Sequence, residues 1–345
     1  MKKLLLAACA AIGLSAAALE AADYPKMNLK LAHFGPKVFV QSEVDQWWAD
    51  EIERRSDGQI KIRVYWGGSI GKATEILKLV GNGVIDFGAT PQAYFPNELP
   101  LIGAPNAVPA VFQDRAAAVA VSQELVEQNP HVQAELDANN VHPLFFHALN
   151  SFYPLCTKPV TSMQDFEGLK IRSFGAFQPP MWDALGAVGV NVFPPDIYEG
   201  LQRGLLDCGF FSADLYKATK LYEVATHMAD VGVGPVTTWP IWVNQDKWNN
   251  SYPDNVKQLI SEVSQEAQAR SLAALAKAEV EAFAFLKEKG VELHTFSDPD
   301  AYNAAIPDMI DVWSANMKAK GLEAEAKSVA SFWRDRMAEL ENLSH

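Results

Sequence analysis

The sequence predicts an α/β protein of two lobes, and three observations lead to that prediction. Strand-like and helix-like segments alternate three times between residues 28 and 89, the order typical of βαβ units on a largely parallel sheet. The chain has 345 residues, of which 49% are apolar, enough for two ordinary hydrophobic cores. Two apolar, strand-like runs flank a second α/β set, as expected of strands that cross between lobes.

Side-chain periodicity predicts the individual elements of the first half. Strands are expected where apolar and polar residues alternate, and helices where apolar residues recur every three or four positions. Asp57-Gly58 and Asn82-Gly83 mark turns between these segments. We therefore expect strands at Asn28–His33, Gln59–Trp66 and Val84–Ala89, helices at Ser42–Arg55, Thr74–Val80 and Ala116–Leu136, and a proline-broken loop at Ala104–Pro109.

The second half contains the two crossing runs and a long helical segment. Leu144–Cys156 and Val231–Asn244 are the apolar, aromatic runs predicted to cross between lobes. Asp254–Lys289 contains neither proline nor glycine, is rich in Ala, Glu, Lys and Leu, and stops at Gly290. A single helix of about 36 residues would reach roughly 50 Å, and two helices joined by a bend are the alternative.

The first residues predict export. Lys2 and Lys3 precede the apolar run Leu4–Leu19, and small residues around Ala16–Ala22 offer cleavage sites, so residues 1–22 are predicted to be a secretory signal peptide. No later stretch reaches the roughly 18 consecutive apolar residues needed to span a bilayer. We expect a soluble mature chain in the periplasm.

Charge and cysteine content narrow the classes of partner. The formal net charge of −13 argues against binding to nucleic acid or to an anionic membrane surface. Beyond the predicted signal, the cysteines are Cys156 and Cys208, each within an apolar strand-like run. An oxidising compartment permits a disulfide between them, but two separately buried thiols fit the sequence equally well.

Arg172 is the most informative single residue. It ends the strand-like run K-I-R, which follows Gly168 and precedes the helix breakers Gly175, Pro179 and Pro180. A guanidinium fixed at the end of a buried strand can bind a carboxylate through two parallel hydrogen bonds. The alternative is a solvent-facing arginine on an edge strand.

The segments around Arg172 carry a family resemblance. Gly168–Arg172 reads G-L-K-I-R, and Ile197–Asp207 reads I-Y-E-G-L-Q-R-G-L-L-D. Together they resemble the signature of the DctP-type solute receptors of TRAP transporters, in which G-L-K-I-R is followed by a helix and then by V-Y-x-A-L-Q-x-G-x-x-D-G-Q-E-N-P. The match ends at Asp207.

The resemblance implies a fold and a function. The fold is a two-lobed periplasmic binding protein, type II-like, with crossing strands and one long C-terminal helix along both lobes. The expected division is residues 23–149 with 237–277 in lobe I, and 150–236 with 278–345 in lobe II. The expected function is capture of a small organic carboxylate, by lobe closure and without a cofactor, for a membrane permease driven by an ion gradient. We expect a monomer and no enzyme.

The resemblance also implies site residues. The carboxylate-binding arginine of the family falls on Arg172, a second arginine found in some members falls on Phe152, and the family's asparagine falls on Phe211. Phe210 is expected in the core because alternation turns it away from Phe211. If aromatic residues line the pocket, the ligand is an aromatic or otherwise apolar acid, with a small 2-oxo or 2-hydroxy acid as the competitor. The other candidate ligand-binding residues are Trp239, Tyr153, Thr90, Tyr94, Phe34 and Trp66.

Two other functions compete with this prediction. Gly67–Gly71 contains the pattern G-x-S-x-G of a hydrolase nucleophile elbow, with Ser69 as nucleophile. Its bases would be His142, His147 or His227, but no H-G-G-G-like oxyanion loop precedes it, and the receptor family has a glycine-rich turn at the same place. A binding protein of an ATP-driven importer would share the same fold.

The sequence predicts no metal site. His142 and His147 are five residues apart on a probable strand, which places them on opposite faces. No H-E-x-x-H, paired C-x-x-C or EF-hand pattern occurs. All seven histidines are therefore expected to be core or solvated residues.

Overall fold

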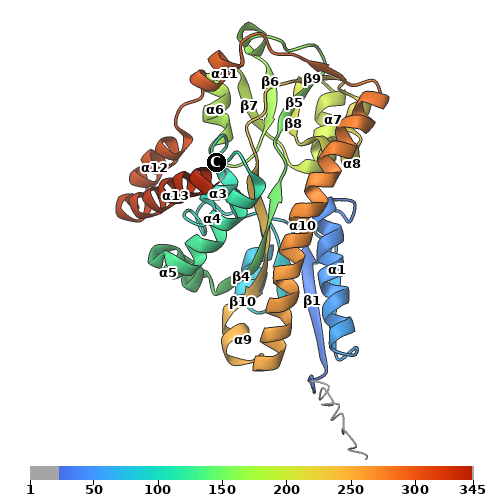
Figure 1. Cartoon of the computed structure of the whole chain (residues 1–345), viewed down its shortest axis with the longest axis vertical. Helices are drawn as coiled ribbons and strands as arrows, with labels where there is room; N and C mark the ends of the chain where they lie inside the picture. Colours follow the sequence, from blue (N-terminus) through green and yellow to red (C-terminus); the bar gives the residue numbers. More distant parts are fainter. Residues whose placement is uncertain (1–22, 344–345) are drawn as a thin grey trace, which may run out of the picture.

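The computed structural model describes residues 23–343, in which two lobes are each built on one β-sheet (Figure 1). The predicted signal peptide, residues 1–22, lies outside the described residues. The sheet of the first lobe has the order β2-β1-β3-β10-β4, with β1 parallel to β2 and β3, and β10 antiparallel to β3 and β4. Its strands are β1 (Met27–His33), β2 (Ile60–Tyr65), β3 (Phe87–Ala89), β4 (Val141–Leu149) and β10 (Val236–Asn244).

The helices of the first lobe follow the predicted order, with two differences. The segment expected as one helix at Ala116–Leu136 is two helices, because Asn129 caps the second helix with its side chain and Pro130 begins it. The expected loop Ala104–Pro109 contains a single helical turn. The helices are α1 (Val40–Arg55), α2 (Ile76–Gly81), α3 (Ala104–Ala107), α4 (Arg115–Gln128) and α5 (Pro130–Asn139).

The sheet of the second lobe has the order β11-β9-β5-β8-β6-β7. Gly168 turns the chain into β6 with a φ of +72°, a backbone conformation that glycine adopts without steric cost. The strands are β5 (Tyr153–Cys156), β6 (Lys170–Ser173), β7 (Val188–Asn191), β8 (Cys208–Phe211), β9 (His227–Ala229) and β11 (Glu292–His294), and the helices are α6 (Gln178–Ala184), α7 (Ile197–Gln202), α8 (Ala213–Thr219) and α11 (Pro299–Ala305).

The chain crosses between the lobes at both predicted runs. The first run is not one strand but two, since β4 belongs to the first sheet and β5 to the second, with residues 150–152 between them. At this crossing Asn150 is buried and donates hydrogen bonds to Asp214 Oδ1 (2.9 Å) and to the Leu275 carbonyl (3.1 Å). The chain returns from β9 to β10 through residues 230–235.

A single long helix runs beside both lobes. Helix α10 (Asp254–Glu288) is continuous over 35 residues, so the prediction of one long helix is confirmed. It packs against α1 and β4 in the first lobe and against α8 in the second (Figure 1). Because α10 is continuous and packs on both lobes, it connects them independently of the crossing segments.

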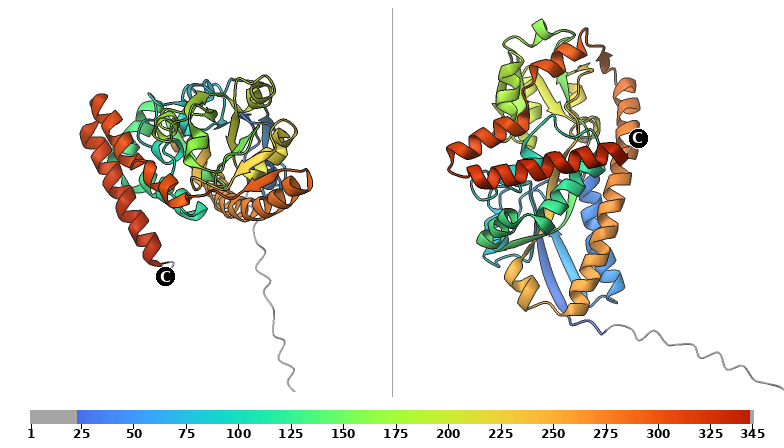
Figure 2. Two further views of the ribbon diagram at one scale, coloured as in Figure 1. Left: turned by 90° about the horizontal axis from the view of Figure 1, so that it is seen from above. Right: turned by 60° about the vertical axis from the view of Figure 1, so that its left-hand side comes forward.

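The C-terminal helices pack differently from the expected division. Strand β11 belongs to the sheet of the second lobe, and Tyr302 of α11 packs there against Phe166. Helices α12 (Met309–Ala319) and α13 (Glu323–Leu343) instead lie against the first lobe, where α13 packs beside α4 (Figure 2). Trp333 stacks on Phe112 at a ring-centroid distance of 5.2 Å, and Arg336 Nε pairs with Glu124 at 2.8 Å. No described helix, including the short α9 (Gln245–Asn250), combines the length and the apolar character that crossing a membrane requires.

A disulfide joins the two cysteines. Cys156 on β5 and Cys208 on β8 are paired residues of adjacent antiparallel strands, and their sulfur atoms are bonded. Both side chains are fully buried. Of the two alternatives that the sequence left open, the structure therefore has the bridge.

Removing this disulfide should destabilise the protein. The bridge closes a loop with a sequence separation of 52 residues, so loop-closure entropy predicts a contribution of about 4 kcal/mol. Urea unfolding should shift to lower concentration when the native protein is treated with dithiothreitol. A C156S/C208S variant should show the lower stability and no response to the reductant. Equal unfolding midpoints with and without reductant in the native protein would contradict the prediction.

Candidate functional site

A small pocket lies between the two lobes, with Arg172 at its base. Arg172 stands on β6, between β7 and β8, and only 2% of its surface is exposed. The cavity volume is about 40 Å³, below the several hundred ångström³ of a typical small-molecule site, so a ligand larger than a few atoms requires the lobes to separate. The lining residues are Phe34, Phe39, Pro91, Tyr94, Asn106, Leu149, Phe152, Arg172, Phe174, Pro194, Phe211, Leu215, Thr238 and Trp239.

The guanidinium of Arg172 is held by backbone and by rings. Its Nε donates to the Val192 carbonyl (3.1 Å) and its Nη1 to the Phe210 carbonyl (3.3 Å). Its central carbon lies 4.7 Å from the ring centre of Phe174 and 4.6 Å from that of Phe211, within the range of cation–π attraction. These contacts fix the side chain but leave several of its five N–H donors available.

Arg172 is a buried cation without a counter-charge among the described residues. Among residues 23–343, no carboxylate lies within ion-pair distance of its guanidinium. Burial lowers the pKa of Arg172 to about 10, which still leaves it charged at neutral pH. A buried charge is costly unless it is paired, so an anion bound beside Arg172 would offset that cost.

Six of the nine predicted site residues line this pocket together. The second lobe contributes Arg172 and Phe211, with Phe152 from the crossing segment, and the first lobe contributes Phe34, Tyr94 and Trp239. Phe34 and Trp239 meet edge to face at a centroid distance of 4.9 Å, as do Phe152 and Phe211 at 5.6 Å. Phe210 is fully buried in the core and packs on Trp182, as expected from the alternation of β8.

Three predicted residues lie outside the pocket lining. Trp66 packs on the ring of His33 behind the wall, at 4.6 Å. The hydroxyl of Thr90 donates to the Ala73 carbonyl (2.8 Å), so its polar group is used within the first lobe. Tyr153 turns its ring toward Phe283 on α10 (5.6 Å), on the side of the strand opposite to Phe152.

Sequence reasoning missed several lining residues. Phe174 follows Arg172 by two positions, so the alternation of side chains along an extended chain was a usable signal for it. Asn106 and Thr238 carried no such signal. Asn106 is buried, accepts a hydrogen bond from the Ala93 amide (3.0 Å) and donates one to the Thr237 carbonyl (2.6 Å), so long-range contacts alone place it.

A wider space adjoins the pocket at the mouth of the cleft. It has a volume of about 430 Å³, and its walls come from both lobes, with Gly67, Gly68 and Lys72 on one side and Pro195 and Thr219 on the other. Tyr94 stands between the two spaces and touches Phe193 of the second lobe edge to face, at 5.3 Å. The two lobes therefore meet in an aromatic contact directly over the pocket.

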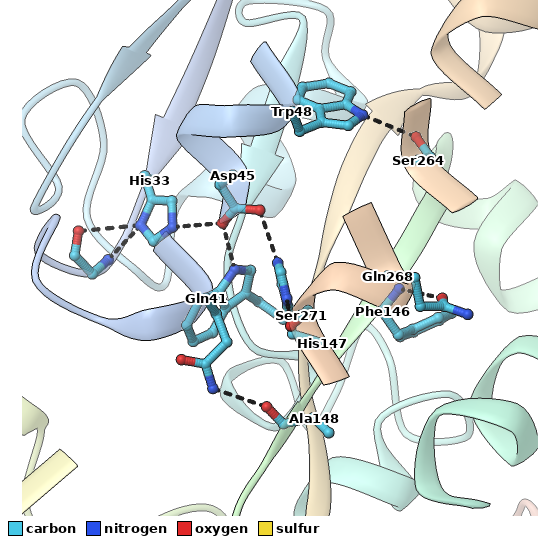
Figure 3. A network of polar contacts seen from close by, with 12 residues as sticks. His33, Gln41, Asp45, Trp48, Phe146, His147, Ala148, Ser264, Gln268 and Ser271 are labelled. Atoms are coloured by element: carbon cyan, nitrogen blue, oxygen red, sulfur yellow. Dashed lines mark hydrogen bonds and ion pairs between the residues drawn. The ribbon is translucent and has the colours of Figure 1, made fainter. Parts of the chain in front are cut away.

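Behind the first-lobe wall lies a buried hydrogen-bond network centred on Asp45 (Figure 3). Asp45 is fully buried on α1. Its Oδ2 accepts from His33 Nε2 (3.0 Å) and Trp239 Nε1 (2.9 Å), and its Oδ1 accepts from His147 Nε2 (2.8 Å). His147 Nδ1 lies 2.7 Å from the hydroxyl of Ser271 on α10. The carboxylate of Asp45 on α1 thus connects strands β1, β4 and β10, and His147 extends the network to α10.

The histidine partners of Asp45 keep its carboxylate ionised. His33 Nδ1 lies 2.9 Å from the Gly35 amide nitrogen and 3.1 Å from the Gly35 carbonyl oxygen, and its Nε2 donates to Asp45. Burial raises the pKa of Asp45. The charges and hydrogen bonds of His147 and His33 lower it by more than burial raises it, so the net pKa of Asp45 is well below its usual value. Asp45 is therefore an anion that orients the indole of Trp239.

The alternative serine-hydrolase site is not assembled in this structure. Ser69 lies in the turn after β2, where Gly67 and Gly68 have φ of +61° and +73°. The three candidate bases have partners elsewhere: His147 bonds to Asp45, His142 stacks on Trp248, and His227 contacts His294. The glycines are accounted for by the backbone conformation of the turn.

Comparison with known protein families shows which family this chain belongs to. Residues 31–318 match the family DctP, described as bacterial extracellular solute-binding protein, family 7. The chain belongs to this family. The match spans most of the described residues, and the predicted resemblance is confirmed. Members of the family are solute-binding proteins rather than enzymes.

Individual relatives are distant but extend over most of the chain. A solute-binding protein of Roseobacter denitrificans is 23% identical over 311 residues, covering 86% of this chain and 90% of its own length. A TRAP periplasmic solute-binding protein of a Sulfitobacter species, solved with bound β-D-galacturonate, has a TM-score of 0.75 and 16% identity, covering 89% of this chain and 99% of its own. DctP7 of Bordetella pertussis, an extracytoplasmic solute receptor binding pyroglutamic acid, has a TM-score of 0.75 and 18% identity with the same coverage. These likenesses confirm the two-lobed α/β fold.

Replacing Asp45 with asparagine should destabilise the protein at neutral pH. The amide cannot accept from all three N–H donors, and each buried donor left without an acceptor costs about 1–3 kcal/mol. Because the folded-state pKa of Asp45 is lowered, its stabilisation is full above the unfolded pKa of about 3.9 and declines as the pH falls below it. Urea unfolding of the two proteins at a series of pH values measures this difference.

The matched control for this prediction is D50N, on the exposed face of the same helix. D50N should change the free energy of unfolding by less than about 0.5 kcal/mol. A D45N protein as stable as the wild type at pH 7 would show that the network does not contribute to stability.

Proposed function

We propose that this protein is the solute receptor of a TRAP-type transporter and captures a small organic carboxylate with Arg172. The observation that carries this proposal is the buried guanidinium, which has no acidic partner among the described residues and lies in a pocket between two lobes. A carboxylate would complete its hydrogen bonds with charge-assisted pairs. Support also comes from the relatives, because both galacturonate and pyroglutamic acid carry a carboxylate.

The walls of the pocket favour an aromatic or otherwise apolar acid. Rings from both lobes surround Arg172, while Asn106 already uses its amide within the first lobe. Few polar groups remain to recognise the hydroxyls of a sugar acid, and stacking on flat rings is the interaction available. A small 2-oxo or 2-hydroxy acid is the competing ligand class.

Capture would proceed by closure of the lobes on the ligand. The carboxylate would bind Arg172 in the second lobe, and the body of the acid would contact Phe34, Tyr94 and Trp239 in the first. Since a ligand shifts an equilibrium only by its differential affinity for the two states, contacts with both lobes favour the closed form. The crossing segments 150–152 and 230–235 would serve as the hinge, and the closed receptor would deliver the acid to membrane permease subunits from the periplasm.

Replacing Arg172 should weaken acid binding without unfolding the protein. R172A should weaken the affinity for the cognate acid by about 2–5 kcal/mol, because the ligand carboxylate would be buried without its partner. R172M should have the same effect, yet its ligand-free form should be at least as stable as the wild type, since an unpaired buried charge has been removed. Calorimetric titration gives the affinity, and thermal unfolding gives the stability.

R203A is the control for the arginine variants. Arg203 follows α7, is 75% exposed at its side chain and pairs with Glu199, away from the pocket. It should retain full affinity. Acid binding by R172A at wild-type strength would refute the proposed role of Arg172.

Replacing Phe211 should separate the two ligand classes. F211N restores the polar residue type that the receptor family carries here and removes a ring beside the guanidinium. Aryl acids should lose about 0.5–1.5 kcal/mol more binding free energy than 2-oxo acids of similar size. Titrations with benzoate, phenylacetate, pyruvate and 2-oxobutyrate measure the difference. Equal losses in both classes would contradict ring stacking at Phe211.

A further inference from the structure

Two histidines and a glutamate meet at the outer edge of the second sheet, far apart in sequence. β11 pairs in parallel with β9, in a register that sets Glu292 beside His227 and His294 beside Ala229. Glu292 and His294 are two residues apart on one strand and therefore share a face, which is also the face of His227. None of the three residues lines the pocket around Arg172.

The three side chains bring one ligand atom each to a common point. His227 Nδ1 lies 2.9 Å from His294 Nε2, and Glu292 Oε2 lies 3.6 Å from each of these nitrogens. Around a tetrahedral metal ion with bonds of about 2.0–2.1 Å, ligand atoms are about 3.3 Å from one another. The observed triangle matches that spacing before any side chain moves.

Direct pairing accounts for only part of this arrangement. The two imidazoles can share one hydrogen bond at 2.9 Å, but 3.6 Å from carboxylate to nitrogen exceeds hydrogen-bond length. The carboxylate thus lies at ion-pair distance from both nitrogens without a hydrogen bond to either. A cation between the three atoms would satisfy all of them.

The surroundings give the site a fixed backbone and access to solvent. The Glu292 amide donates to the Thr226 carbonyl and the Asp230 amide to the His294 carbonyl, both at 2.9 Å, so the ladder holds the ligands in register. The side chains of His227 and His294 are 22% and 19% exposed, and that of Glu292 is 67% exposed. An ion can therefore enter from solvent, and the half-buried rings need little further ordering to bind it.

We propose that His227, Glu292 and His294 form a binding site for a divalent transition-metal ion, with Zn²⁺ as the best chemical fit. Two neutral imidazoles and one carboxylate are a common zinc ligand set, and three protein ligands leave a fourth position for water or a group of another molecule. The bound ion would fasten β11, where the chain leaves α10, to β9, which leads into the second crossing. The site acts on the edge of the lobe and takes no part in acid capture.

The test uses the mature protein without a histidine tag, stripped with EDTA and dialysed. Titration with ZnCl₂ should show one equivalent bound and a raised melting temperature. Titration with CoCl₂ should produce the visible ligand-field absorption of a tetrahedral Co²⁺ site. H227Q and H294Q should each weaken Zn²⁺ binding at least about tenfold and remove the Co²⁺ absorption, while acid binding at the Arg172 pocket stays at wild-type strength.

The matched control is H142Q. His142 is a partly exposed histidine that stacks on Trp248 in the first lobe, so its loss should leave metal binding intact. Absence of one-equivalent binding in the wild type would overturn the proposal. Binding that survives in both H227Q and H294Q would overturn it as well, because the ion would then be held elsewhere. Two independent variants guard against a folding defect in one of them.

Discussion

The buried carboxylate of Asp45 is the interaction on which the geometry of the first lobe depends. It accepts hydrogen bonds from His33 on β1, His147 on β4 and Trp239 on β10. An unpaired carboxylate in this position would be costly, whereas three N–H donors make the anion the favoured state. The sheet, α1 and, through Ser271, α10 are therefore constrained together. Trp239 lines the pocket, and its indole is oriented by the hydrogen bond to Asp45 rather than by contacts within the pocket.

The second lobe presents the opposite situation. Its buried charge, Arg172, is oriented by two backbone carbonyls and two rings but has no counter-charge among the described residues. A satisfied anion in one lobe makes a rigid wall, and the cation in the other lobe is where we propose that the ligand's carboxylate binds. This division of roles suits a receptor, because the free energy of pairing becomes available only when a ligand arrives. In the proposed function, aromatic residues from both lobes would determine which anions fit.

Local signals accounted for much of the fold. The strands at β1, β2 and β6 and helices α1 and α10 follow from side-chain periodicity and from the placement of glycine. The segment predicted as one helix at Ala116–Leu136 is divided at Pro130. The proline was a local signal for this break, but the prediction followed the apolar pattern instead. The C-terminal helices α12 and α13 were expected on the second lobe, yet α13 packs against α4 of the first lobe and α12 packs against α13. The apolar faces of α12 and α13 indicate that both helices pack against the rest of the protein. An amphipathic pattern does not specify which lobe provides the packing surface.

The sequence by itself determined the α/β class, the two crossings and the segment Asp254–Lys289 without proline or glycine, because each depends on periodicity or on a short motif. Only the tertiary structure decided which side chains share a space. It joined Cys156 to Cys208, brought Phe34, which follows β1, and Trp239 of β10 into one pocket lining with Arg172, left Thr90 and Tyr153 outside, and assembled both the Asp45 network and the His227–Glu292–His294 cluster. These features depend on strand order and register across more than a hundred residues in several cases, and such long-range pairing is set by the packing of the whole core rather than by neighbouring residues.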